Sequence, residues 1–453
     1  MIATASDAAA REERRLAWVV APVAVGILAA GLSALSLTHS LGLSEIEEVL
    51  EARRPWSQLV PFAHADASGS AFVAALAGWL HVGSADWAVR VPSVVAVALA
   101  CVCVYFLAAR LFDRLVGLVA GAALATSQLT VDMGSRVGAL ALAILAVSLA
   151  SWLFVVAAES GRGLAWASYT VVAVAAVFVH ASCAFVIVAH AAATPWLPRV
   201  RARAAAVCVA LAAVLAVPAV VQALDGRRHL LDVLAQPDLA DVGRAVHVVS
   251  GRNVVVLALA LCGVVLLALG VVRGGELWKI VLLAIWAAAP LVGVLLLSIA
   301  RPSLDARYLA VSAPALAVLA AVGLLQLPRR ELVAAVAVAA LAVSGVRIAQ
   351  DVRSTPEDWS GAVTYALATR EPGDRVVVAP ARALAAFSYY AGKNRGSRTA
   401  GGQTDLVVVR ADTQEDALEA ARGTVRPPAY ALLDVRPFGR NLWVQRWERT
   451  GLR

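Results

Sequence analysis

The sequence predicts an all-α polytopic membrane protein with a C-terminal α/β domain. Hydrophobic residues make up 61% of the 453 residues and charged residues only 15%, a balance that excludes an ordinary soluble globule. About eleven apolar segments approach the length needed to cross a bilayer, which is on the order of 20 helical residues. The polar sequence gathers in a loop over residues 41–90 and a block over residues 351–453. We therefore expect a transmembrane domain over residues 1–350 and a separate domain over residues 351–453.

The formal charge of +8 does not indicate a nucleic-acid partner, because the basic residues lie in short loops rather than on one basic face. Only Lys279 and Lys393 of the 39 basic residues are lysines, and Ala and Val are abundant. This bias is typical of a GC-rich bacterium such as an actinobacterium. All five cysteines lie in apolar segments, so we expect neither disulfides nor a cysteine metal site. We predict no cofactor, and nothing in the spacing supports a divalent metal.

Arginines in the short loops give the orientation through the positive-inside rule. The arginines that precede the first apolar run place the N-terminus in the cytoplasm, and that run is long enough to remain as an anchor. The basic loops alternate consistently only if residues 69–82, too short to cross, form a helix on the outer membrane surface. Spans are then expected near residues 16–38, 91–110, 115–131, 136–158, 163–180, 182–197, 203–224, 254–272, 277–299, 308–327 and 331–349. The protein is thus predicted to lie in the cytoplasmic (inner) membrane, with the first loop and the C-terminal block outside.

The C-terminal block has the composition of a small α/β unit. Short β-branched runs predict strands at residues 374–380, 406–410 and 430–435. Residues 356–368 and 414–423 between them favour helices. The block is either an outer cap on the membrane domain or a separate binding domain.

Five short motifs of the chain match the motifs of a known family in their order and spacing. They are Leu43-Ser44-Glu45, Arg90-Val91-Pro92-Ser93, Gly134-Ser135-Arg136, Arg307-Tyr308-Leu309 and Glu357-Asp358-Trp359. In this pattern the chain resembles the polytopic GT-C glycosyltransferases, particularly the bacterial group related to protein mannosyltransferases and lipid A aminoarabinose transferases. The resemblance implies transfer of a sugar from a polyprenyl-phosphate carrier to an acceptor outside the membrane. It also implies a carboxylate in the first outer loop that acts as general base.

The resemblance directs attention to the acidic residues of the first loop. A hydroxyl is a poor nucleophile near neutral pH and needs a carboxylate within hydrogen-bond reach. Ser44 stands where the family has its catalytic aspartate, so the expected base is Glu45 or Asp66. The alternatives are a solvated acidic start of a helix for Glu45 and a helix-capping role for Asp66.

Four further residues are candidates for substrate binding. Arg136, Arg301 and Arg307 lie at outer span ends, and Tyr308 follows one of them. Guanidinium groups bind phosphate well, so these residues are expected to hold the carrier phosphate. The alternative is that they reach lipid headgroups without binding substrate. His180, at the end of an apolar run, is either a substrate contact or a satisfied polar residue.

Two functions follow from this reading. The first is a membrane glycosyltransferase that uses a lipid-linked sugar donor, with mannose or arabinose as the expected sugar and a cell-envelope glycan or glycolipid as acceptor. The second is a catalytically inactive GT-C-like protein that binds a lipid-linked glycan or a partner enzyme. The loss of the aspartate at Ser44 favours the second, and the retained Arg307-Tyr308 pair favours the first. Membrane lipids are expected partners in both.

Overall fold

The computed structural model describes residues 19–59, 70–226, 237–272, 276–300, 304–355, 357–370, 373–393, 400–425 and 430–449. The chain forms two compact units. The membrane unit comprises Met1–Leu35, Arg54–Trp79 and Arg90–Ile348. The second unit comprises Ser36–Arg53, Leu80–Val89 and Ala349–Arg453, so it combines parts of the first polar loop with the C-terminal block. It is called the outer unit here after the side of the membrane on which the sequence predicts it.

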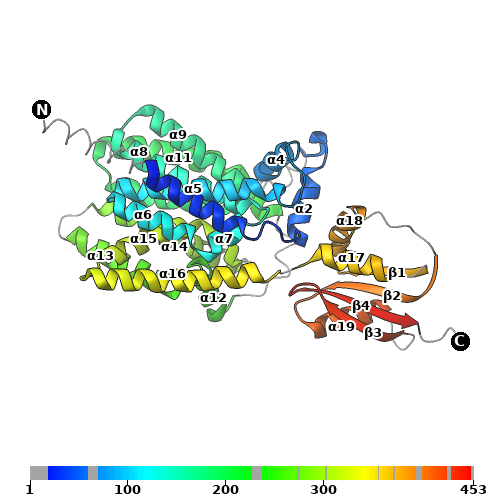
Figure 1. The fold of residues 1–453 in the computed structure, drawn as a ribbon. Coiled ribbons are helices and arrows are strands. Elements are labelled where there is room, and N and C mark those ends of the chain that lie inside the picture. The colour runs from blue at the N-terminus through cyan, green and yellow to red at the C-terminus, as the bar shows by residue number, and fades with distance from the viewer. Residues whose placement is uncertain are drawn as a thin grey trace, which may run out of the picture. The chain divides into compact units, whose positions relative to one another are not determined.

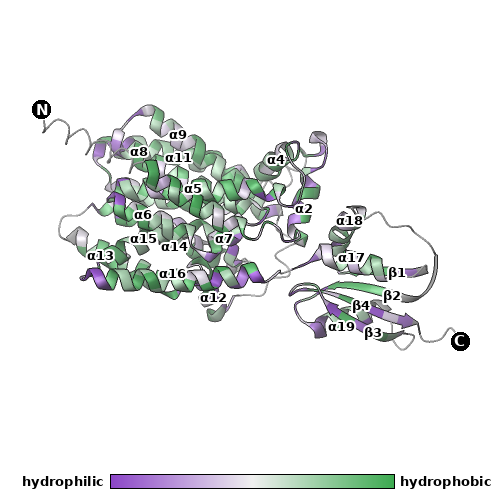
Figure 2. Cartoon of the chain, in the orientation of Figure 1, coloured by the Kyte–Doolittle hydropathy of each residue, from purple (hydrophilic) through white to green (hydrophobic). Residues whose placement is uncertain are grey.

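Helices of the membrane unit lie side by side, and most are hydrophobic along their length (Figures 1 and 2). In chain order they are Val19–Ala34, α4 (Ser70–Trp79), α5 (Val91–Leu111), α6 (Arg114–Ala125), α7 (Gln128–Gly134), α8 (Ala139–Ser160), α9 (Gly163–Val179), α10 (Ala184–Ala193), α11 (Arg199–Gly226), α12 (Leu239–Val249), α13 (Val254–Val272), α14 (Leu277–Ala300), α15 (Ala313–Leu325) and α16 (Arg330–Arg353). Short 3-10 turns η1 (Ala88–Arg90), η2 (Ala181–Cys183), η3 (Thr194–Trp196) and η6 (Ala306–Ser312) join some of them.

The predicted helical membrane fold is confirmed, whereas the count of eleven spans is not. Among the described residues, six helices are long and apolar enough to cross a membrane alone. Two bent pairs, α6–α7 at 62° and α12–α13 at 89°, bring the number to as many as eight. The other predicted spans coincide with shorter apolar helices. The short helix expected within residues 69–82 is present as α4, and its position on the membrane surface stays a prediction, while α12 was not predicted.

Small residues allow close helix contacts in the membrane unit, as the pair α13 and α15 shows. A Cβ atom added at Gly263 would collide with the carbonyl oxygen of Leu319, and one added at Gly323 with that of Leu259. Between helices that are apolar on all sides, close van der Waals packing takes over the role of hydrophobic burial. Glycine at both positions is therefore required for the two backbones to meet.

The outer unit contains a four-stranded sheet with the order β1-β2-β4-β3. Its strands are β1 (Gly373–Ala379), β2 (Ala400–Arg410), β3 (Tyr430–Pro437) and β4 (Leu442–Arg449). β1 and β2 pair in parallel, with Val377 opposite Val407, and the other two pairings are antiparallel. The helices are α2 (Leu43–Ala52), α17 (Trp359–Thr369), α18 (Leu384–Lys393) and α19 (Gln414–Val425).

The α/β character of the C-terminal block is thus confirmed, with two elements that were not predicted. Parallel strands need a crossover, and α18 lies in the connection from β1 to β2. The missed strand β4 lies between β2 and β3 and buries Leu442, Val444 and Trp447. Its arginine and glutamate residues hide the apolar alternation that marks a strand.

Candidate functional site

The acidic helix α2 carries the first candidate residue, Glu45, which is only 5% exposed. Its Oε2 accepts a hydrogen bond of 2.9 Å from the backbone N–H of Gly42, the residue that precedes the helix. A glutamate at the third helical position often satisfies this otherwise orphaned donor. Glu45 therefore stabilises the start of its own helix, while the neighbouring Ser44 is exposed.

A second carboxylate, that of Glu357, lies at the same end of α2. Its Oε2 accepts hydrogen bonds from the Leu43 N–H at 2.9 Å and from Trp359 Nε1 at 2.8 Å. Its Oε1 pairs with Arg410 Nε of β2 at 2.6 Å. The Glu357 side chain is only 8% exposed, so these contacts are largely shielded from water. One carboxylate thus joins the acidic helix, α17 and the sheet.

Two tyrosines of α18 extend this network beside α2, against which α18 packs (Figure 1). The Tyr390 hydroxyl accepts a hydrogen bond of 2.7 Å from the Leu41 N–H and donates one of 2.8 Å to Asp86 Oδ2. Tyr389 donates to Asp86 Oδ1 at 3.1 Å, and the Arg53 guanidinium lies 5.2 Å from its ring centre. Both ends of α2 are therefore fixed within the outer unit.

The surroundings of Glu357 and Glu48 shift the pKa values of these two carboxyl groups in opposite directions. Burial alone would raise the pKa of Glu357, but the bonds from Leu43, Trp359 and Arg410 outweigh it, and the pKa is lowered. Burial, reinforced by the charges of Glu51, Glu45 and Glu47, raises the pKa of Glu48 to about 8. Among the described residues, the Oε2 atom of Glu48 is buried without a hydrogen-bond partner. Glu357 is therefore an anion at neutral pH, whereas Glu48 is protonated.

The predicted binding residues lie in the membrane unit, around one corner formed by α7, η2 and η6. Arg136 donates from Nε to Asp132 Oδ1 at 2.7 Å, one helical turn earlier. Arg307 donates from Nη2 to Asp305 Oδ2 at 2.8 Å and interacts electrostatically with Asp132 as well. Asp132 therefore links the two arginines. Both remain well exposed, at 47% for Arg136 and 63% for Arg307.

His180 and Tyr308 meet at the same corner, with ring centres 5.5 Å apart. The His180 Nδ1 accepts from the Ser182 N–H at 3.3 Å and lies 2.7 Å from the Ser182 hydroxyl. An acceptor Nδ1 leaves the proton of the neutral ring on Nε2. His180 is buried and caps the turn η2, which gives it a structural role beside any contact with a ligand.

The structure thus brings Arg136, His180, Arg307 and Tyr308 to one corner and places Glu45 in the outer unit. Asp66 and Arg301 lie outside the described residues. Sequence reasoning did not include Asp132 among the residues of the corner and did not predict the burial of Glu48. Asp132 had a signal, since a carboxylate four residues before an arginine pairs with it on a helix. Glu48 had none, because its burial depends on tertiary packing.

No metal centre is evident in the part of the chain that the structure describes. No group of three or more His, Cys, Asp or Glu side chains is placed to hold an ion there. The cysteines of the apolar segments are unpaired. The exposed guanidinium groups of Arg136 and Arg307 are instead suited to an anion with several oxygens, such as a phosphate.

Comparisons with known proteins concern the fold of the chain. Residues 69–222 match the family described as dolichyl-phosphate-mannose-protein mannosyltransferase. No curated protein sequence matches the chain significantly. The fold is similar to ArnT from Cupriavidus metallidurans in its apo state, with a TM-score of 0.59 at 14% identity, over 96% of this chain and 98% of that one.

ArnT bound to undecaprenyl phosphate gives a TM-score of 0.57 at 14% identity, over 95% of this chain and 98% of that one. The archaeal oligosaccharyltransferase AglB from Archaeoglobus fulgidus, in complex with an inhibitory peptide and a dolichol-phosphate, gives 0.53 at 11% identity. That match covers 86% of this chain and 69% of AglB. The chain is therefore a multi-pass membrane protein whose fold is similar to those of ArnT and AglB.

Proposed function

We propose that this protein transfers a sugar from a polyprenyl-phosphate carrier to a hydroxyl of a cell-envelope glycan or glycolipid outside the cytoplasmic membrane. The observation that carries the proposal is the pair of exposed arginines, Arg136 and Arg307, joined through Asp132 in a fold shared with carrier-dependent proteins. ArnT is known bound to undecaprenyl phosphate and AglB to a dolichol-phosphate. A carrier phosphate is the ligand that this corner fits by charge.

The proposed reaction is a displacement at the anomeric carbon. The acceptor oxygen forms a bond to that carbon while the bond to the carrier phosphate oxygen breaks, and the electron pair leaves with the phosphate. Arg136 and Arg307 hold the charge of the departing phosphate, with Tyr308 and His180 beside it. Arg301, which lies outside the described residues, is proposed as a third cation. A carboxylate takes the proton of the acceptor hydroxyl.

Glu45 remains the proposed base, with Asp66 as the alternative. Glu48 cannot serve at neutral pH because it is already protonated. Glu357 holds the Leu43 N–H and thereby the start of the helix that carries Glu45. Under this proposal the outer domain positions the first loop and is more than a cap.

A second candidate, a GT-C-like protein without catalysis that binds a lipid-linked glycan or partner, is supported by one specific observation. The Glu45 carboxylate is buried and engaged with Gly42, and the adjacent residue is Ser44 instead of an acid. A carboxylate that serves only as a cap does not need its charge, because a glutamine oxygen accepts the same bond. This difference provides the test.

The test is the glycolipid and envelope-glycan profile of cells that lack the protein, complemented with variants. Glu45→Gln keeps the cap and removes the proton acceptor, so turnover should fall by about 100-fold or more. Glu45→Ala, which loses both the helix cap and the proton acceptor, is the matched variant. Its expression level shows how much the cap contributes to stability. Full complementation by the double variant Glu45→Gln, Asp66→Asn would contradict the enzyme and support the binding protein.

The proposed orientation places the N-terminus in the cytoplasm and the outer unit outside. Single cysteines at the exposed positions Ser57 and Gly423, in a background without native cysteines, should react with an impermeant thiol reagent in intact cells. A cysteine at Gly270, near a predicted cytoplasmic loop with open space around it, should react only after permeabilisation. The proposed orientation is wrong if the cysteine at position 57 or 423 fails to react in intact cells, or if the cysteine at position 270 reacts before permeabilisation.

A further inference from the structure

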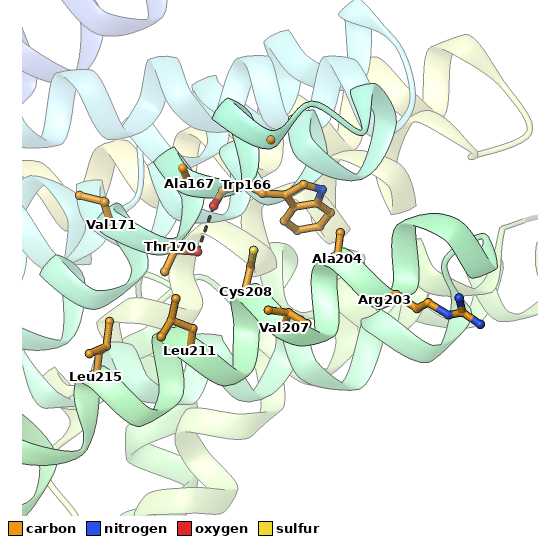
Figure 3. A pocket seen from close by; sticks show the side chains of 11 residues that line it. Trp166, Ala167, Thr170, Val171, Arg203, Ala204, Val207, Cys208, Leu211 and Leu215 are labelled. Carbon is orange, nitrogen blue, oxygen red and sulfur yellow. Dashed lines mark hydrogen bonds between the residues drawn. The ribbon is translucent and has the colours of Figure 1, made fainter.

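An open groove lies between α9 and α11, away from the corner proposed to bind the carrier. It has a volume of about 740 Å³ and lies between residues of the first halves of both helices. Trp166 and Thr170 form the α9 side, and Val207 and Leu215 are on the α11 side (Figure 3). The Thr170 hydroxyl already donates to the Trp166 carbonyl at 3.0 Å. Apart from Arg203, most of the side chains that line the groove are apolar, which favours a hydrocarbon occupant.

One end of the groove is positively charged. Arg203 lies at that end, and Leu215 at the other (Figure 3). Within the described residues Arg203 has no ion pair or side-chain hydrogen bond. Arg199 lies one turn before Arg203, and Arg162 directly precedes Gly163, which also lines the groove. Both arginines are exposed, and the first turn of α11 has no acidic residue. An anion at this end would be attracted without competition from a nearby carboxylate of α11.

The length of the groove limits the occupant further. From Arg203 to Leu215 the helix rises about 18 Å, close to half of the roughly 30 Å hydrocarbon core of a bilayer. The groove therefore fits a chain that spans a single leaflet with a negative headgroup at the interface. A long polyprenyl chain exceeds that length, whereas an ordinary acyl chain matches it.

We propose that the groove between α9 and α11 binds one acyl chain of an anionic glycerophospholipid, with the lipid phosphate on Arg203. The site lies in the leaflet of the Arg162 and Arg203 loops, which is the cytoplasmic leaflet in the proposed topology. It is independent of the proposed glycosyl transfer. The lipid fills the groove and stabilises the contact between two helices that otherwise leave apolar surface open.

Binding to the purified full-length protein can be measured by native mass spectrometry with phosphatidylglycerol and phosphatidylcholine. Phosphatidylglycerol should bind more tightly, and Arg203→Gln should weaken it about fivefold, since one arginine near an anionic lipid contributes about 1 kcal/mol. Phosphatidylcholine carries the same phosphate but no net charge, so Arg203→Gln should weaken its binding less than that of phosphatidylglycerol. Arg329→Gln, an exposed arginine of another loop, is the matched control and should leave both lipids unaffected.

Cys208 lines the groove and reports occupancy directly. In a Cys262→Ala background, N-ethylmaleimide should modify Cys208 in detergent, and phosphatidylglycerol should slow this reaction in the parent protein more than in Arg203→Gln. Val207→Trp, at an exposed position of the groove wall, should abolish the protection by filling the groove. Equal protection by both lipids, or no effect of Arg203→Gln, would overturn the proposal. Displacement of phosphatidylglycerol by polyprenyl phosphate at equal concentration would assign the groove to the carrier instead.

Discussion

The two charged regions of the molecule are built in opposite ways. At the corner of the membrane unit, the ion pairs join near neighbours in sequence, Asp132 with Arg136 and Asp305 with Arg307, and the arginines stay exposed. In the outer unit, Glu357 is buried and bonds to Leu43, more than 300 positions away. Exposed pairs contribute little to stability and can exchange partners, whereas a buried pair is costly to break. The corner is therefore suited to binding an anion, and the buried network to holding α2 in place.

The largest effect that this comparison predicts is that of Glu357→Ala. The change leaves Arg410 without its partner and removes the acceptor for the Leu43 N–H and Trp359 Nε1. Loss of one member of a buried pair costs about 3–5 kcal/mol. Thermal unfolding of the purified protein should show this loss, and hydrogen exchange should accelerate in the peptide over residues 41–52.

The matched control for Glu357→Ala is Arg436→Ala, which breaks an exposed pair with Asp434 on the same sheet. It should cost no more than about 1 kcal/mol and leave exchange in residues 41–52 unchanged. Glu357→Gln, which keeps an acceptor for both N–H groups but loses the charge, should fall between the two. Equal effects of Glu357→Ala and Arg436→Ala would contradict the distinction between the two regions.

A second effect concerns Glu48 and depends on pH. Its pKa rises from 4.5 to about 8 on folding, so between these values the folded protein holds a proton that the unfolded chain releases. The free energy of unfolding therefore falls as the pH rises, by at most about 1.4 kcal/mol per pH unit. Glu48→Gln stays neutral and should become progressively more stable than the parent from pH 4.5 to about 8.

Melting temperatures across this pH range measure the effect. Below pH 4.5 the parent and Glu48→Gln should melt alike, because the carboxyl is then protonated in both folded and unfolded states. Glu415→Gln, at an exposed position in the first turn of α19, should show no such divergence. If Glu48→Gln gains no stability at alkaline pH, the Glu48 side chain is not desolvated in the folded protein.

The sequence predicted the helices and the corner better than the buried network, for a physical reason. Apolar length identifies membrane helices, and a motif such as Arg307-Tyr308 is readable because its members are adjacent. The capping role of Glu45 was also accessible, since it depends on a residue three positions away. The bond from Leu43 to Glu357 and the burial of Glu48 arise only when distant segments pack, so no local pattern reveals them.

Arginine substitutions at the corner give the smallest expected effect. If Arg136 and Arg307 hold a carrier phosphate, Arg307→Gln should weaken binding of a polyprenyl phosphate to the purified protein by about threefold to tenfold. The expected range lies below the roughly 1.5–3 kcal/mol typical of hydrogen bonds to charged groups, because both arginines are partly solvated and must leave their carboxylates. Stability should change by less than about 1 kcal/mol, unlike the effect of Glu357→Ala.

Arg110→Gln, which breaks an exposed pair with Glu159 elsewhere in the membrane unit, is the control and should leave carrier binding unchanged. The prediction is contradicted if the double variant Arg136→Gln, Arg307→Gln keeps both its affinity for polyprenyl phosphate and its melting temperature. Both arginines would then only contact lipid headgroups, and the main support for carrier binding at this corner would be lost.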